Sequence, residues 1–279
     1  MVLDLIVSPH LARKQPWRLL IAAVFFVTFG VFAHLWLPTV KGSIIIFAMI
    51  PAIPLFWSLV VREEAQEEKV RCLPTQSFAY HKRLIVLFAY LFVGSAAAYA
   101  FWYAVLPAEV SANAFQDQLQ EIKTLKLIGG GVTGKLLAEA SPGIAALTGR
   151  AFSTDFFWTL LAHNMNVLVI LFALSLVYGI GSIYVLLWNA SIIGVFIGLK
   201  VQAQGGIGIL TAVLGLLPHG MLEIGGYLLA SIAGGILSAA IMRHHFKRPE
   251  FKWIIIDVVL LAVVSILMLA AGAAIEATY

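Results

Sequence analysis

Long apolar blocks are the feature that most constrains how this 279-residue chain can fold. Each block is about 20 residues long, which is the length a helix needs to cross roughly 30 Å of hydrocarbon. The seven blocks cover residues 19–37, 43–61, 84–106, 156–180, 182–199, 219–242 and 253–275. The sequence therefore predicts an all-α, polytopic transmembrane bundle of about seven spans.

The composition favours lipid as the solvent of this chain. Hydrophobic residues make up 61% of it and charged residues only 11%, which is too little polar surface to coat a water-soluble globule of this size. The net charge of +4 comes from Lys and Arg between the blocks, so we interpret it as contacts with lipid headgroups and not as a nucleic-acid surface. Cys72 is the single cysteine, which excludes an internal disulfide or a Cys-based zinc site.

The basic residues between the blocks also predict an orientation. If seven spans alternate, the Lys and Arg residues before the first span, between spans two and three, and between spans six and seven share one side. The short loops on the other side hold only Lys41 and Lys200. The positive-inside rule then places the N-terminus in the cytoplasm and the C-terminus outside the cell membrane.

The blocks divide the chain into a three-span region, an external segment and a four-span core. These regions cover residues 1–106, 107–155 and 156–279. In the external segment Phe115, Leu119 and Ile122 share one face of an amphipathic helix, which either covers the bundle as a lid or offers a platform to a protein partner. The charged stretch 62–71 is a solvated extension or a second partner surface. The sequence also leaves open whether the chain forms a homo-oligomer.

Polar side chains inside the blocks point to function, because a bilayer makes them costly to retain. His219 and Glu223 are four residues apart, so they share a helical face and can touch or bind one ligand, and Glu223 is expected to be neutral or paired with His219. We expect Asp257 to be an interfacial carboxylate near Arg243 or Lys252. The remaining members of the predicted polar cluster are His163, Asn164, Asn166 and Asn189.

Small residues indicate which helix faces turn inward. Gly226, Ala230 and Gly234 continue the face of the sixth block that carries the polar pair, and such a stripe lets another backbone approach closely. Gly194 and Gly198 form a second stripe on the fifth block. We expect the two stripes to pack against each other.

A short apolar piece precedes the sixth block. Residues 209–217 are too few to cross a bilayer, and Pro218 does not continue a helix normally. We therefore expect a re-entrant or interfacial half-helix that feeds the sixth span. Irregular backbone at membrane depth is tolerated only beside protein or a water-filled space, so a cavity is expected there.

An ordered set of motifs lies between residues 160 and 226. An Asn-containing span is followed by Gly-Ile-Gly, a span with a central Asn, and Pro-His-Gly with a Glu four residues after the His. This order resembles the core of the stage II sporulation protein M family of prokaryotic membrane proteins. The chain departs from the family pattern at His163, Gly225 and Gly226. The matching positions are Asn164, Gly179, Gly181, Asn189, His219, Gly220 and Glu223.

The resemblance implies a scaffold in a prokaryotic cell membrane. The family's namesake recruits cell-wall hydrolases during engulfment, and the wider family is described as membrane-remodelling. We favour such a non-enzymatic role, with no cofactor, in which the polar cluster fixes helix packing. A transporter or channel with a His/Glu site is the alternative. A metal-dependent hydrolase is a third, in which His163, His219 and Glu223 would bind Zn²⁺.

Overall fold

The computed structural model describes residues 15–37, 43–67, 77–128, 154–178, 182–242 and 251–278. Every regular element within these ranges is a helix, so the predicted all-α architecture is confirmed. The N-terminal helices are α3 (Arg18–Trp36), α4 (Ser43–Glu67), α5 (Ser77–Val105), α6 (Ala108–Ala114) and α7 (Gln116–Ile128). The C-terminal helices are α9 (Thr154–Tyr178), α10 (Ser182–Gln204), α11 (Ile207–Met242) and α12 (Phe251–Glu276).

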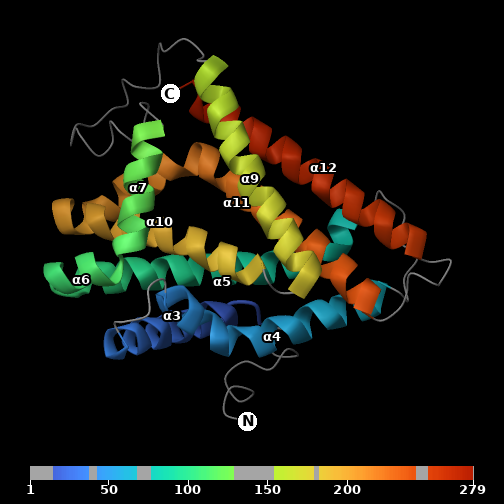
Figure 1. Cartoon of the computed structure of the whole chain (residues 1–279), viewed down its shortest axis with the longest axis horizontal. Helices are drawn as coiled ribbons and strands as arrows, with labels where there is room; N and C mark the ends of the chain where they lie inside the picture. The colour runs from blue at the N-terminus through green and yellow to red at the C-terminus, as the bar shows by residue number, and fades with distance from the viewer. Residues whose placement is uncertain are drawn as a thin grey trace.

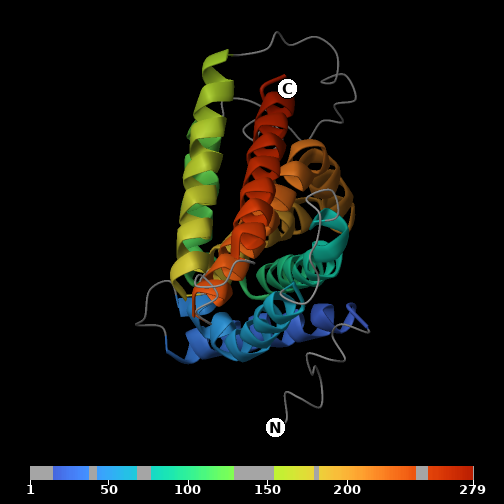
Figure 2. The same ribbon diagram turned by 90° about the vertical axis from the view of Figure 1, so that its right-hand side faces the viewer.

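Helix α11 is the centre of the bundle. It packs against α12, α9 and α10, while α10 packs on α5 and α5 on α3. Figure 1 shows α3 and α4 below α5 and α10, with α9 and α12 inclined across the opposite side. In Figure 2 these last two helices stand side by side. The His219–Met242 part of α11 is accordingly the most buried of the candidate spans.

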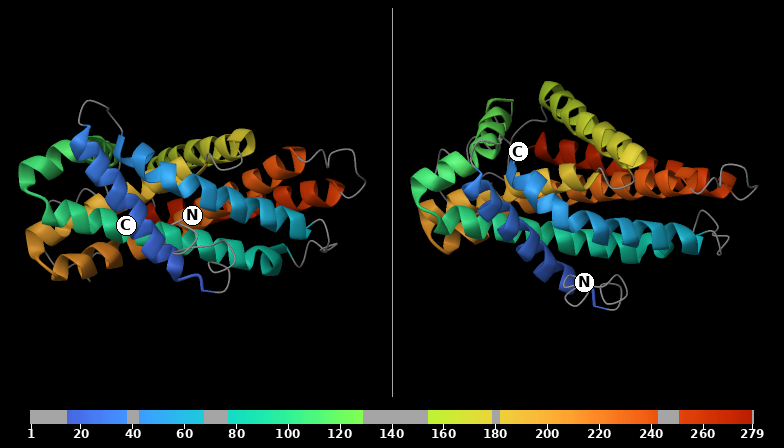
Figure 3. Two further views of the ribbon diagram at one scale, coloured as in Figure 1. Left: turned by 90° about the horizontal axis from the view of Figure 1, so that it is seen from below. Right: turned by 60° about the horizontal axis from the view of Figure 1, so that its bottom comes forward.

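The helices alternate in direction along the bundle. Figure 3 shows the end of α4, the start of α5, the end of α11 and the start of α12 together at one end. The opposite end carries α6 and the turn from α10 to α11. The exposed basic residues Lys82, Arg83 and Lys252 lie near the starts of α5 and α12, so they share the first end. Alternating spans produce this arrangement of charge.

Six helices of the described ranges are long and apolar enough to cross a membrane. They are α3, α12 and parts of α5, α9, α10 and α11. Helix α4 contributes only a shorter apolar stretch, Ile44–Phe56, which contains Pro51 and Pro54. The multi-pass character of the chain is thus confirmed, whereas the seventh span stays a prediction.

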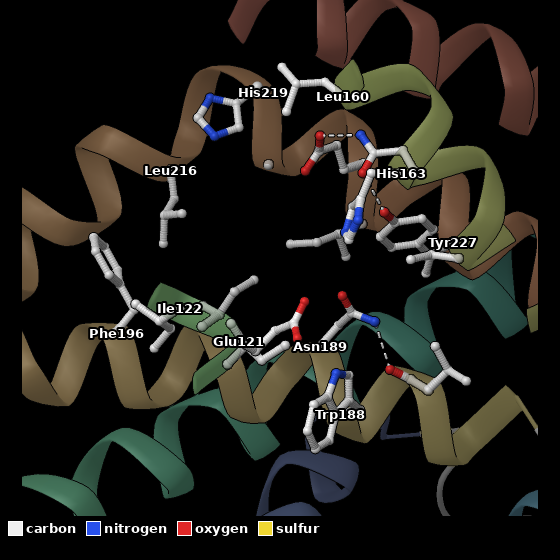
Figure 4. Close-up of a pocket in the computed structure, with 18 of the residues that line it drawn as sticks. Glu121, Ile122, Leu160, His163, Trp188, Asn189, Phe196, Leu216, His219 and Tyr227 are labelled. Atoms are coloured by element: carbon white, nitrogen blue, oxygen red, sulfur yellow. Dashed lines mark hydrogen bonds between the residues drawn. The ribbon is translucent and has the colours of Figure 1, made fainter. Parts of the chain in front are cut away.

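The expected half-helix is helical but continuous with the sixth span. The short apolar stretch Ile207–Leu217 and the span that follows form the single helix α11, which runs through Pro218. Figure 4 shows the ribbon bending between Leu216 and His219, where the proline lacks a backbone N–H. Before it, Gly205 has a φ of 65° and makes the tight turn from α10. The helix is therefore bent and not broken.

The glycines of α10 face α5. A Cβ on Gly194 would lie 2.6 Å from the backbone oxygen of Ala96 and 2.6 Å from the Cβ of Tyr99. A Cβ on Gly198 would lie 2.9 Å from the Cβ of Tyr103. The small residues thus allow these two parallel helices to touch through their backbones.

The small residues of α11 face two other helices. The Ser265 hydroxyl of α12 donates a 2.7 Å hydrogen bond to the backbone oxygen of Gly226. A Cβ on Gly234 would lie 2.7 Å from the Cβ of Ser175 in α9, and Ala230 is buried between these positions. The prediction that the stripes of α10 and α11 pair with each other is therefore wrong, because each stripe receives a different neighbour.

The amphipathic helix of the external segment lies on the bundle as α7. Phe115, just before it, is fully buried and makes edge-to-face contacts with Tyr99 and Tyr103 of α5. Ile122 is also buried, and α7 packs on α10. Residues 129–153 of the segment lie outside the described residues. The apolar face of the predicted helix is thus covered by protein.

The α5–α10 contact predicts a matched pair of glycine variants. Gly194→Ala should lower the free energy of unfolding by about 1–3 kcal/mol, because the new methyl group meets backbone that cannot yield cheaply. Gly206→Ala should leave it unchanged, since a Cβ there would meet no atom within 4 Å apart from those of its chain neighbours. Thermal unfolding in one detergent measures both. Equal stability of the two variants would contradict the close approach of α10 to α5.

Candidate functional site

A cavity of about 380 Å³ lies among α7, α9, α10 and α11, beside the bend in α11 (Figure 4). Five residues of the predicted polar cluster line it, namely His163, Asn164, Asn189, His219 and Glu223. The sixth, Asn166, is exposed on α9 and does not line it. The structure thus brings most of the cluster to one internal space, and leaves one member outside.

The amide of Asn164 joins α9 to α11. Its Nδ2 donates a 2.6 Å hydrogen bond to Oε1 of Glu223, and its Oδ1 accepts a 2.9 Å hydrogen bond from the hydroxyl of Tyr227. Asn164 is only 4% exposed. Because an unpaired polar group in this setting is costly, the two bonds stabilise the contact between these helices.

Helical periodicity explains which side chains turn inward. Asn164 and Leu168 are four residues apart on one face of α9, and both are buried. Asn166, two residues on, falls on another face and is exposed. On α11, Glu223 lies where α12 passes closely, because a Cβ on Gly272 would be 3.1 Å from the Glu223 Cγ. The small residue therefore lets α12 cover the back of this carboxylate.

Asn189 presents its side-chain oxygen to the cavity. Its Nδ2 donates a 2.8 Å hydrogen bond to the backbone oxygen of Val185, one turn earlier in α10. Figure 4 shows the amide oxygen turned upward into the open space. The residue therefore offers an acceptor to a ligand while its donor group is already used.

The two histidines stand apart from the hydrogen-bond network. Within the described parts of the chain, the Glu223 carboxylate is bonded to Asn164 and not to His219. Figure 4 shows His163 and His219 on separate walls of the cavity. No group of three or more His, Cys, Asp or Glu among the described residues is arranged to hold a metal ion. The proposed Zn²⁺ ligand set of His163, His219 and Glu223 is thus not assembled.

The cavity is also lined by polar residues that the sequence analysis did not single out, among them two glutamates and a tyrosine. Glu121 comes from α7, Tyr227 from α11 and Glu276 from the end of α12. Tyr227 follows Glu223 by four residues, so the spacing that linked Glu223 to His219 also indicates it. No comparable signal marks Glu121 or Glu276, which reach the cavity only through tertiary packing.

A second buried polar contact lies away from the cavity. Nε2 of His81 in α5 is 2.7 Å from Oδ2 of Asp257 in α12, and both residues are buried. The interpretation of Asp257 as an interfacial carboxylate beside a basic residue missed this partner. Arg243, one of the two expected neighbours, lies outside the described residues, as do Gly179 and Gly181. The contact links α5 to α12.

Comparisons with known proteins bear on the region that builds the cavity. The family model described as Stage II sporulation protein M matches residues 84–279, which include every residue of the cavity lining. An uncharacterized protein of Methanocaldococcus jannaschii is 27% identical over 123 residues, or 43% of this chain and 68% of that protein. No solved structure matches this chain.

The amide network predicts a non-additive pair of substitutions. Tyr227→Phe should lower the free energy of unfolding by about 0.6–1 kcal/mol, because one hydrogen bond is lost. Asn164→Ala should cost about 2 kcal/mol or more, since it also leaves Glu223 without its donor. In the Asn164→Ala background, Tyr227→Phe should cost nothing further. Unfolding is measured on the unchanged chain, the two single variants and the double variant. A double variant whose cost equals the sum of the two single costs would contradict the network.

Proposed function

This chain belongs to the Stage II sporulation protein M family, and from that membership we propose that it is a non-enzymatic scaffold or membrane-remodelling component. It carries several helices long and apolar enough to cross a membrane, so its partners meet it at the bilayer surface or within the bilayer. The proposed role is to organise those partners through the surface of α6 and α7. Membrane lipids and other proteins are the expected contacts.

The observation that carries this proposal is the packing of α6 and α7 against the rest of the bundle. Phe115, between the two helices, is fully buried against Tyr99 and Tyr103. The opposite face of α7 exposes Gln120 and Lys123. A polar surface held at a fixed place on a membrane bundle suits docking of a soluble domain, because little ordering entropy remains to be lost on binding.

The charge distribution supports an orientation for this surface. Lys82, Arg83 and Lys252 lie at the end of the bundle opposite α6 (Figure 3). By the positive-inside rule the basic end is cytoplasmic, which puts α6 and α7 on the outer side of a prokaryotic cell membrane. In this arrangement the N-terminus is cytoplasmic and the C-terminus external.

Site-directed photo-crosslinking in cells tests the scaffold proposal. A benzoylphenylalanine residue at position 120, on the exposed face of α7, should give an adduct with another protein. The same residue at position 169 of α9 should give no such adduct, because Val169 is an exposed apolar side chain within a candidate membrane span. Protein adducts at neither position, or equally at both, would contradict a docking surface on α7.

A transporter or channel is the second candidate, and the cavity favours it. Polar groups from α7, α9, α10 and α11 surround an internal space next to a bent helix, a combination that membrane transport proteins use. Reconstituted liposomes with a pH-sensitive dye should show proton flux that Glu223→Gln abolishes and Lys123→Gln preserves. Flux no greater than in protein-free liposomes would exclude proton conduction and leave the scaffold role.

A further inference from the structure

We propose that the cavity binds an organic ammonium cation. The proposal is independent of the scaffold role, because it concerns the interior of the bundle and not the outer face of α7. Carboxylates reach the cavity from three different helices: Glu121 from α7, Glu223 from α11 and Glu276 from α12. Neither Lys nor Arg is among the described residues that line it. The charge of the site therefore favours a cation and opposes an anion.

The second observation is the buried imidazole of His219. This residue is 8% exposed and lines the cavity, and Figure 4 shows its ring on the inner side of the bend in α11. Its ring nitrogens make no hydrogen bond to another described residue, so they remain available to a ligand in the cavity. A ligand with N–H donors would give the neutral imidazole a hydrogen-bond partner. Asn189, with its amide oxygen turned into the space, offers a second acceptor.

We expect aromatic side chains of the cavity lining to contribute to the binding of an ammonium group. Tyr184 and Trp188 of α10 and Tyr227 of α11 line the same cavity. The face of an aromatic ring attracts a cation, and the interaction is stronger where water is excluded. Carboxylates, acceptor groups and rings together match an organic ammonium group, which pairs charge and N–H donors with apolar carbon.

The size and the donor set argue for an organic cation over a metal ion. About 380 Å³ falls in the range of small-molecule sites, which is roughly 300–1,000 Å³, and greatly exceeds the space a bare ion needs. In the described ranges, His, Cys, Asp and Glu are not gathered into a metal-binding group. The ammonium group has two sources, a free small amine or the ethanolamine headgroup of a membrane lipid.

Two arms of one experiment distinguish these sources. The purified full chain in a non-ionic detergent is titrated with ethanolammonium chloride, with sodium chloride at equal ionic strength as the reference, and the melting temperature is recorded. In parallel, native mass spectrometry records whether phosphatidylethanolamine stays bound after extraction from vesicles of equal parts phosphatidylethanolamine and phosphatidylglycerol. A rise specific to ethanolammonium supports a free amine, and selective retention of phosphatidylethanolamine supports the lipid headgroup.

Matched variants tie the binding to the cavity. Glu121→Gln removes a cavity charge from a residue that has no hydrogen bond to another described residue, so the fold should be retained. Glu223→Gln replaces a second carboxyl group of the cavity with an amide while keeping an acceptor for Asn164. Each should weaken binding about tenfold or more. Lys123→Gln, on the exposed face of α7, should leave binding unchanged.

The outcomes that overturn the proposal are equally defined. Sodium and ethanolammonium could shift the melting temperature equally while phosphatidylethanolamine is not selectively retained, which would mean that ionic strength alone acts. Binding of either probe that is unchanged in Glu121→Gln and in Glu223→Gln would place the ligand elsewhere. A negative result in both arms would not affect the crosslinking experiment at position 120. The ammonium proposal and the scaffold proposal can therefore be rejected independently.

Discussion

The amide of Asn164 is the interaction on which this account of the molecule depends. Inside a membrane bundle an amide must find partners within the protein, and this one uses its donor on Glu223 and its acceptor on Tyr227. The two bonds tie α9 to α11 and hold the carboxylate of Glu223 inside the bundle. Without them, the Glu223 carboxylate would lack its hydrogen-bond donor, and α9 and α11 would no longer be joined beside the cavity.

Backbone contacts at glycine set the positions of the helices around this network. Gly226 brings α12 against α11, Gly234 brings α9 against it, and Gly194 fixes α10 on α5. Since these contacts allow little change in helix spacing, the space left between α7, α9, α10 and α11 is a consequence of where the close contacts fall. Packing and site geometry are thus parts of one arrangement.

The sequence predicted features that depend on local spacing and failed where contacts are long-range. Apolar block length indicated the spans, and the four-residue interval predicted that His219 and Glu223 share a face. Small residues at Gly194 and Gly226 indicated that some helix approaches closely but not which one, so the predicted pairing was wrong. The position of Glu121 at the cavity and the contact of His81 with Asp257 both depend on packing between segments far apart in the chain. No local sequence pattern indicates either of them.

The most direct measurement is a near-atomic map of the full chain in a lipid nanodisc, examined around residue 223. The account predicts a carboxylate enclosed by α9, α11 and α12, with one oxygen within hydrogen-bond distance of the Asn164 amide and the Tyr227 hydroxyl on the other side of that amide. A map in which this carboxylate points at acyl chains, or in which α9 lies away from α11, would contradict it.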